Sequence, residues 1–276
     1  MKRILFFALM IPILTGFQHR PVVWVAVGDS ITYLNDHPDE TKFRIHKGYL
    51  TDVTEKIPWL QYRNQGRNGW TVQRFATEID SLHIPAGDVY TVFLGTNDWW
   101  HGTPLGTWGD YEDRTGAGTV YGSFRILIDK LHQLNAAAPI ILITPMQRGD
   151  FVYINDPNNN AWGSYRSKDG QSLQQVANAV MDIGRREHLD VVDLYDDSRL
   201  SMQRLVHYKR LVDPGTGKYR DYSFPAYTTI PYHPATDAYP YPAGAMDMTF
   251  DGLHPSDKGH EEIAKKILSE FRKLIH

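Results

Sequence analysis

The 276-residue sequence contains no cysteine. This absence excludes disulfide bonds, thiolate nucleophiles, zinc sites built on cysteine and lipid anchors attached to cysteine. A marked excess of charge of one sign is also missing, because 29 lysines and arginines face 32 aspartates and glutamates, for a formal net charge of −3. We therefore expect neither a nucleic acid nor an anionic membrane surface as a partner.

Long apolar runs are missing except at the amino terminus, where Lys2 and Arg3 precede an apolar stretch over residues 4–14. A positive charge followed by a short apolar run is typical of a secretory signal peptide, and this run is shorter than a membrane span requires. The alternatives are a short N-terminal anchor and a buried first strand. We predict a signal peptide over residues 1–20 and a secreted or periplasmic protein with no membrane span in the mature chain.

The rest of the chain alternates between two kinds of apolar pattern. Short, near-continuous apolar runs predict strands buried on both faces of a parallel sheet, at 22–27, 89–94, 139–144 and 190–194, with a weaker candidate at 60–65. Apolar residues at steps of three and four predict helices, at 120–134, 172–188 and 258–275. This alternation predicts an α/β fold with a doubly wound sheet. No internal repeat or linker divides the chain, so residues 21–276 are predicted to form one domain.

Three segments, 101–119, 145–171 and 205–249, lack these patterns and are rich in Gly, Pro, Asn and Tyr. In an open α/β sheet, long loops at the carboxyl ends of strands usually build the ligand site. They are candidates for that site, although length alone does not distinguish a binding loop from decoration.

Ser30 follows the first of these strands directly, in the sequence Gly28-Asp29-Ser30. A lone serine in this place commonly caps the next helix. Catalysis by serine needs a base and a group that orients the base. Asp251 and His254 supply both types, three residues apart in a Gly- and Pro-containing turn before the last helix. This spacing lets the carboxylate reach the imidazole and leaves the other ring nitrogen free for a hydroxyl.

Donors for an oxyanion are available after two other strands. Gly66 and Gly69 lie in a loop after 60–65, where a backbone N–H can approach a ligand closely. Asn97 follows 89–94 and offers a side-chain amide from the same sheet edge as Ser30. Taken singly, each of these features is ordinary turn chemistry.

Taken together, four motifs resemble the four sequence blocks of the SGNH hydrolases, also called GDSL esterases or lipases. The motifs agree in order and spacing and span the chain from residue 28 to residue 255: Gly28-Asp29-Ser30; Asn64 and Gly69 with Thr71; Gly95-Thr96-Asn97-Asp98; and Asp251-Gly252-Leu253-His254-Pro255.

The resemblance implies a role for each matching residue. Ser30 would be the nucleophile, His254 the general base and then the general acid, and Asp251 the group that orients His254. The oxyanion hole would consist of the backbone N–H groups of Ser30 and Gly69 and the side-chain amide of Asn97. The family also implies a flavodoxin-like three-layer α/β/α sandwich with a five-stranded parallel sheet in the order 2-1-3-4-5, and no cofactor.

Other kinds of hydrolase are disfavoured by what the motifs lack. The stretch from Gly28 to Thr32 has no second glycine, so it does not match the G-x-S-x-G elbow of α/β-hydrolases. His233, Asp237, Asp251 and His254 have no spacing typical of a metal site, and we expect no metal. A phosphate-binding loop is missing as well.

The substrate is indicated only by composition. The resemblance implies a serine esterase, and the family includes lipases, lysophospholipases, thioesterases and esterases that deacetylate polysaccharides. The segments 99–119 and 205–249 are rich in aromatic rings, which suit sugar faces, and poor in aliphatic residues. We therefore expect a small-molecule or glycan ester as substrate, with acetyl groups on extracellular carbohydrate favoured, and no protein partner. A lipid or thioester substrate remains open, as does an inactive sugar-binding protein.

The segments 99–119 and 205–249 are predicted to form the wall of the substrate-binding site. Their aromatic residues are Trp99, Trp100, Trp108, Tyr227, Tyr232, Tyr239 and Tyr241.

Overall fold

The computed structural model describes residues 20–274, so all of the predicted signal peptide except Arg20 lies outside the described residues. Its centre is a parallel sheet of five strands in the order β2-β1-β3-β4-β7. Read along the chain, this order is 2-1-3-4-5, and the fold prediction is confirmed, including the weak strand. The strands of this sheet are β1 (Val22–Gly28), β2 (Leu60–Gly66), β3 (Val89–Phe93), β4 (Ile140–Ile143) and β7 (Asp190–Val192).

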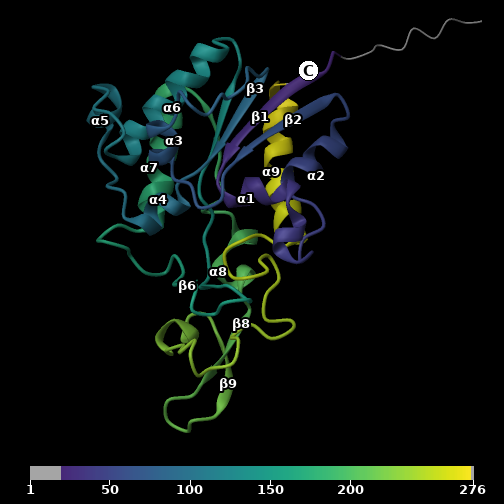
Figure 1. Ribbon diagram of the computed structural model, residues 1–276, viewed down its shortest axis with the longest axis vertical. Coiled ribbons are helices and arrows are strands. Elements are labelled where there is room, and N and C mark those ends of the chain that lie inside the picture. The colour runs from purple at the N-terminus through teal and green to yellow at the C-terminus, as the bar shows by residue number, and fades with distance from the viewer. Residues whose placement is uncertain (1–19, 275–276) are drawn as a thin grey trace, which may run out of the picture.

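Helices cover both faces of the sheet (Figure 1). Successive residues of β1 explain why its sequence is apolar throughout: Trp24 and Ala26 pack into one core cluster, and Val25 and Val27 pack into the other. A strand alternates its side chains between faces, so a doubly covered strand needs apolar residues at every position. One face carries α2 (Tyr49–Lys56) and α9 (Asp257–Leu274), and the other carries α3 (Val72–Thr77), α6 (Val120–Leu134) and α7 (Leu173–Glu187).

The long helices begin where side chains cap them. Thr119 accepts a hydrogen bond from the Gly122 N–H at the start of α6, and Ser172 forms a capping box with Gln175 at the start of α7. All three predicted helices are confirmed to within one or two residues. Within residues 20–274, no helix is long and apolar enough to cross a membrane. Shorter elements are α1 (Ser30–Tyr33), α4 (Thr96–His101), α5 (Trp108–Glu112), α8 (Met202–Leu205) and the 3₁₀ turns η1 (Leu34–Asp36), η2 (Pro38–Thr41), η3 (Ser198–Leu200) and η4 (Ala226–Thr229).

Two of the segments without a predicted pattern contain small antiparallel hairpins, which lie beyond the carboxyl ends of the sheet strands, at the lower end of Figure 1. The second hairpin was not predictable from hydrophobic alternation, because one of its two buried positions is Lys209. The hairpins are formed by β5 (Phe151–Val152) with β6 (Asn160–Ala161), and by β8 (Tyr208–Val212) with β9 (Tyr219–Ser223).

A buried ion pair joins these two segments. The Lys209 Nζ lies 2.6 Å from a carboxylate oxygen of Asp150, and both side chains are largely withdrawn from solvent. The other carboxylate oxygen of Asp150 accepts hydrogen bonds from the Gly163 N–H at 2.7 Å and from the Tyr165 hydroxyl at 2.7 Å. Each charge is therefore compensated, as burial of an ion requires. This pairing holds the segment after β4 against β8.

Candidate active site

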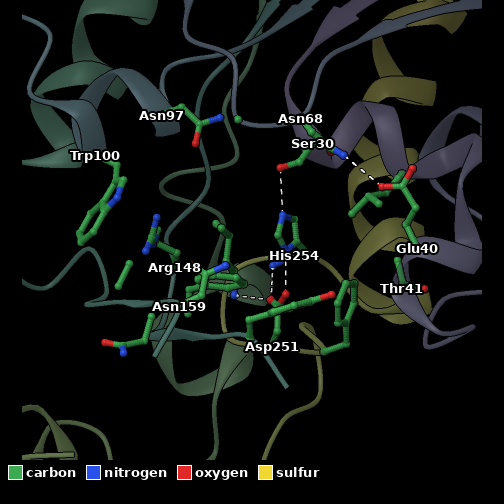
Figure 2. A pocket seen from close by; sticks show the side chains of 18 of the residues that line it. Ser30, Glu40, Thr41, Asn68, Asn97, Trp100, Arg148, Asn159, Asp251 and His254 are labelled. Atoms are coloured by element: carbon green, nitrogen blue, oxygen red, sulfur yellow. Dashed lines mark hydrogen bonds and ion pairs between the residues drawn. The ribbon is translucent and has the colours of Figure 1, made fainter. Parts of the chain in front are cut away.

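The predicted site residues come from the carboxyl ends of neighbouring parallel strands and from the turn before α9. Ser30 begins α1 directly after β1, Gly69 lies in the loop after β2, and Asn97 lies at the start of α4 after β3. Because parallel strands end at the same sheet edge, these residues meet although they are far apart in the sequence. Figure 2 shows Ser30, Asn97 and His254 around one cavity.

His254 is hydrogen-bonded on both ring nitrogens. Its Nε2 lies 2.9 Å from the Ser30 Oγ, and its Nδ1 lies 2.7 Å from the Asp251 Oδ2 (Figure 2). A carboxylate only accepts, so Nδ1 carries a proton that it donates to Asp251, and Nε2 can then accept the Ser30 hydroxyl proton. The arrangement has the connectivity that activates a serine for nucleophilic attack.

The turn that carries Asp251 and His254 is held by the same carboxylate. The Asp251 Oδ1 accepts hydrogen bonds from the backbone N–H of Leu253 at 3.0 Å and of His254 at 2.8 Å. The Phe250 ring stacks on the imidazole with centroids 5.7 Å apart, and the Phe151 ring meets it edge-on at 5.8 Å. One oxygen of Asp251 therefore shapes the turn while the other orients the ring.

The surroundings of His254 act on its pKa in two directions. Burial has the largest single effect and lowers this pKa, but the charge and hydrogen bond of Asp251, together with the charge of Asp29, outweigh it, and the pKa of His254 is raised above its ordinary value. A base with a raised pKa accepts a proton more readily than free imidazole, provided that the pH keeps it neutral.

Three donors can surround an oxyanion beside Ser30. Among the described residues, the backbone N–H groups of Ser30 and Gly69 have no acceptor within the protein. Gly69 has a φ of 70°, in the left-handed region that favours glycine, and no atom lies within 4 Å of where a Cβ would be. The Asn97 Nδ2 donates one proton to the Trp70 carbonyl at 3.0 Å, which leaves its second proton available.

The two aspartates of the motifs hold loops in place. Asp29 accepts a hydrogen bond from the Ile31 N–H at 3.0 Å and caps α1. Asp98 accepts from the N–H groups of Val72 and Gln73 and ties α4 to the start of α3. Burial raises the pKa of both carboxyls to about 6. Neither residue lines the cavity that contains Ser30 and His254.

Comparison with protein families identifies this arrangement. The model of the GDSL-like lipase/acylhydrolase family matches residues 26–262, which contain all four motifs. The chain belongs to this family. It is therefore a hydrolase of the SGNH type. Comparison with curated proteins finds no match.

Solved structures agree with the family assignment. A protein from Chitinophaga pinensis DSM 2588, described as a possible lipase, is 56% identical, with a TM-score of 0.89 over 92% of this chain and 98% of that one. A protein from Lactobacillus plantarum is 20% identical, with a TM-score of 0.63 over 93% and 99%. The acetyl xylan esterase AlAXEase is 20% identical, with a TM-score of 0.52 over 90% and 99%. The last two likenesses concern the fold.

The cavity of this hydrolase has a volume of about 450 Å³ and opens beside Ser30. Trp100 lines it, as expected, but Trp99 does not. The Trp99 side chain is fully buried in the core, and its Nε1 donates to the Gln171 carbonyl at 3.0 Å. Neighbouring residues on a short helix point in different directions, so only one of the two tryptophans faces the cavity. The predicted substrate contact of Trp99 is therefore wrong.

The predicted binding wall also needs correction. Of the segments 99–119 and 205–249, only Trp100 and His101 line the main cavity. The segment 205–249 instead lines a second cavity of about 270 Å³. The main wall comes from residues 148–161, within the candidate segment 145–171, for which no contact residue was predicted, and from the turn 40–44. The lining residues missed by the sequence prediction include Arg148, Phe151, Tyr153, Asn155, Asn159 and Asn160.

A signal for this wall was present in the sequence. Arg148 follows the end of β4 by a few residues, as Asn97 follows the end of β3. Its place in the sequence therefore indicated a position at the carboxyl edge of the sheet, where the site lies. Within residues 20–274, no three histidines and carboxylates lie close enough together to hold a metal ion. His233 is exposed and Asp237 is half-buried, and neither lines the main cavity.

We expect the raised pKa of His254 to set the pH dependence of ester hydrolysis. Only the neutral ring accepts the serine proton, so kcat/KM should fall as the pH decreases through this pKa, with the midpoint above about 6.5. Asp251→Asn removes the carboxylate that raises the pKa, so the acidic limb should move to lower pH while activity drops by about 10⁴-fold. The measurement is kcat/KM for an uncharged ester from about pH 5 to about pH 9. A limb that stays in place in Asp251→Asn contradicts this account.

The amide of Asn97 is expected to act on the transition state. Asn97→Ala should lower kcat by about 10²–10³-fold with little change in KM, because the donor is needed only when the oxyanion forms. Steady-state kinetics on a synthetic ester provides the measurement. Asn68→Ala is the matched control, because Asn68 lines the same cavity but donates to Glu40. A defect of Asn97→Ala confined to KM would refute the oxyanion role.

Proposed function

We propose that the hydrolase removes short acyl groups, acetyl above all, from extracellular carbohydrate. In this proposal the Ser30 Oγ attacks the ester carbonyl and passes its proton to His254, and the oxyanion is held by the donors of Ser30, Gly69 and Asn97. The protonated His254 then gives its proton to the departing sugar oxygen. Water, activated by the same imidazole, releases the acid from Ser30 in the reverse sequence.

The lining of the catalytic cavity carries the proposal. Asparagines stand around Ser30 and offer amide donors and acceptors of the kind that bind hydroxyl groups. Trp100 adds a half-buried indole, whose flat apolar face suits the C–H face of a sugar ring. The lining asparagines are Asn68, Asn97, Asn155, Asn159 and Asn160.

A long acyl chain finds little support in this cavity. Leu34, Leu253 and Ala161 are the aliphatic residues of its lining, and aromatic or polar side chains make up the remainder. Each methylene of a fatty acid contributes only about 0.8 kcal/mol when it is buried, so a lipase needs an extended apolar channel. The volume of about 450 Å³ must hold both the acyl group and part of the alcohol.

Action on lipid acyl chains is the second candidate, and one observation favours it: the 56% identical protein from Chitinophaga pinensis DSM 2588 is described as a possible lipase. Loss of activity is less favoured, since the hydrogen-bonded Ser30, His254 and Asp251 are all present. We further propose export from the cytoplasm, which rests on the basic and apolar residues 2–14.

The length of the acyl chain separates the two candidates. We expect kcat/KM to be highest for acetyl esters and to decrease through butyryl, octanoyl and palmitoyl, because the cavity lacks aliphatic lining for a long chain. The panel uses 4-nitrophenyl esters, with an acetylated oligosaccharide assayed alongside. An increase through octanoyl and palmitoyl would establish a lipase and overturn the sugar-ester proposal.

The same panel tests the role of the indole. Trp100→Ala should reduce kcat/KM for the acetylated oligosaccharide far more than for 4-nitrophenyl acetate. Trp108→Ala is the matched control, because Trp108 stacks on Tyr111 outside the cavity and should leave the ratio of the two rates unchanged. Equal losses on both substrates in Trp100→Ala would mean that the ring only supports the loop of Asn97.

A further inference from the structure

Arg148 is a buried cation that faces the catalytic cavity. It lies on the segment after β4, its side chain is 2% exposed, and it lines the same cavity as Ser30 and His254. Figure 2 shows its guanidinium directed into the space between Trp100 and His254. None of the catalytic roles assigned above uses this group.

The guanidinium has unused hydrogen-bond donors. Its Nη2 donates to the Trp162 carbonyl at 3.2 Å, while its Nε is buried without a partner. The rings of Trp99 and Trp100 lie 5.4 Å and 5.1 Å from the guanidinium carbon and stabilise the charge through their faces. No carboxylate of residues 20–274 forms an ion pair with Arg148.

The carboxylates that act on Arg148 electrostatically are already engaged. Asp150 is paired with Lys209, and Asp251 is hydrogen-bonded to His254. Burial lowers the pKa of Arg148 to about 10, which still leaves the side chain charged at neutral pH. An ion buried without a counter-ion costs free energy, so an arrangement of this kind is expected where a ligand supplies the opposite charge.

The remaining charges of the cavity favour an anion as well. Lys42 and Arg44 also line it, and within the described part of the chain neither forms an ion pair. Besides Asp251, the lining contains one carboxylate, Glu40, which accepts hydrogen bonds from the Tyr33 hydroxyl at 2.7 Å and from Asn68 at 3.2 Å. The lining therefore carries three permanently positive side chains, Lys42, Arg44 and Arg148, against two carboxylates, of which Asp251 is hydrogen-bonded to His254.

We propose that Arg148 binds the carboxylate of an acidic sugar, a uronate, that carries the ester in the catalytic site. Guanidinium and carboxylate are planar groups that match in two parallel hydrogen bonds. The indole of Trp100 lies beside the guanidinium, so one sugar ring can rest on the indole while its carboxylate meets Arg148. This inference rests on the proposed function, whose sugar-ester substrate it narrows to acidic sugars.

The decisive measurement is a ratio of two substrates. The pair consists of the methyl glycosides of acetylated glucuronic acid and acetylated glucose, with acetyl groups at the same positions. The wild type should favour the uronate in kcat/KM, and Arg148→Met should lower that preference by about 10- to 100-fold, the size expected for a hydrogen bond to a charged group. Arg148→Lys keeps the positive charge but loses the planar guanidinium that forms two parallel hydrogen bonds, so it should give an intermediate ratio of kcat/KM for the two substrates.

Arg63→Met serves as the matched control, because Arg63 is exposed on β2 outside the cavity and its loss changes the net charge equally. Its ratio should equal that of the wild type. Arg148→Lys also covers the case in which Arg148→Met does not fold. A uronate preference that is absent in the wild type, or that persists in both Arg148 variants, overturns the inference.

An inhibition experiment separates this inference from the proposed function. Unacetylated methyl glucuronoside should inhibit hydrolysis of 4-nitrophenyl acetate more strongly than methyl glucoside, and Arg148→Met should remove the difference. This inhibition tests the carboxylate site even if acetylated sugars are not substrates, a result that would reject the proposed function alone.

A last comparison locates the carboxylate within the substrate. A preference for 4-nitrophenyl succinate over 4-nitrophenyl butyrate that depends on Arg148 would place the carboxylate on the acyl group and overturn the uronate assignment.

Discussion

The proposed chemistry depends on the hydrogen bond between the His254 Nε2 and the Ser30 Oγ, which are 2.9 Å apart and belong to residues separated by 224 positions. The parallel sheet makes this contact possible, because β1 delivers Ser30 to the edge that the turn before α9 also reaches. Asp251 holds the imidazole through Nδ1 and the turn through two backbone N–H groups. The side chains of Ser30, Asp251 and His254 therefore connect the sheet, the turn before α9 and the path of the proton.

The sequence predicted the features that repeat along the chain or match a motif. Strands buried on both faces require continuous apolar runs, so β1, β3 and β4 were visible, and the motifs placed Ser30, Asn97 and His254 at one edge. Directions of single side chains were not visible. Trp99 and Trp100 are neighbours of the same type, yet the rotation of α4 sends one into the core and the other into the cavity.

Buried charge explains two further features that were not predicted, the β8 strand and the Arg148 contact. Lysine and arginine are usually exposed, so the hydrophobic pattern of the sequence does not predict that Lys209 and Arg148 are buried. Lys209 is buried because Asp150 compensates its charge, and that pair joins the two segments beyond the sheet. Arg148 is buried against tryptophan faces and has no such counter-ion among the described residues. Whether a buried cation has a counter-ion depends on contacts in the folded chain, so the sequence pattern does not distinguish Lys209 from Arg148.

Covalent labelling tests the central claim, that Ser30 is the nucleophile of this hydrolase, most directly. A fluorophosphonate reacts with a serine that a neighbouring base activates, and peptide mass spectrometry locates the modified residue. We expect one label, on Ser30, and loss of both labelling and ester hydrolysis in Ser30→Ala. A label on another serine, or ester hydrolysis that survives in Ser30→Ala, would contradict it.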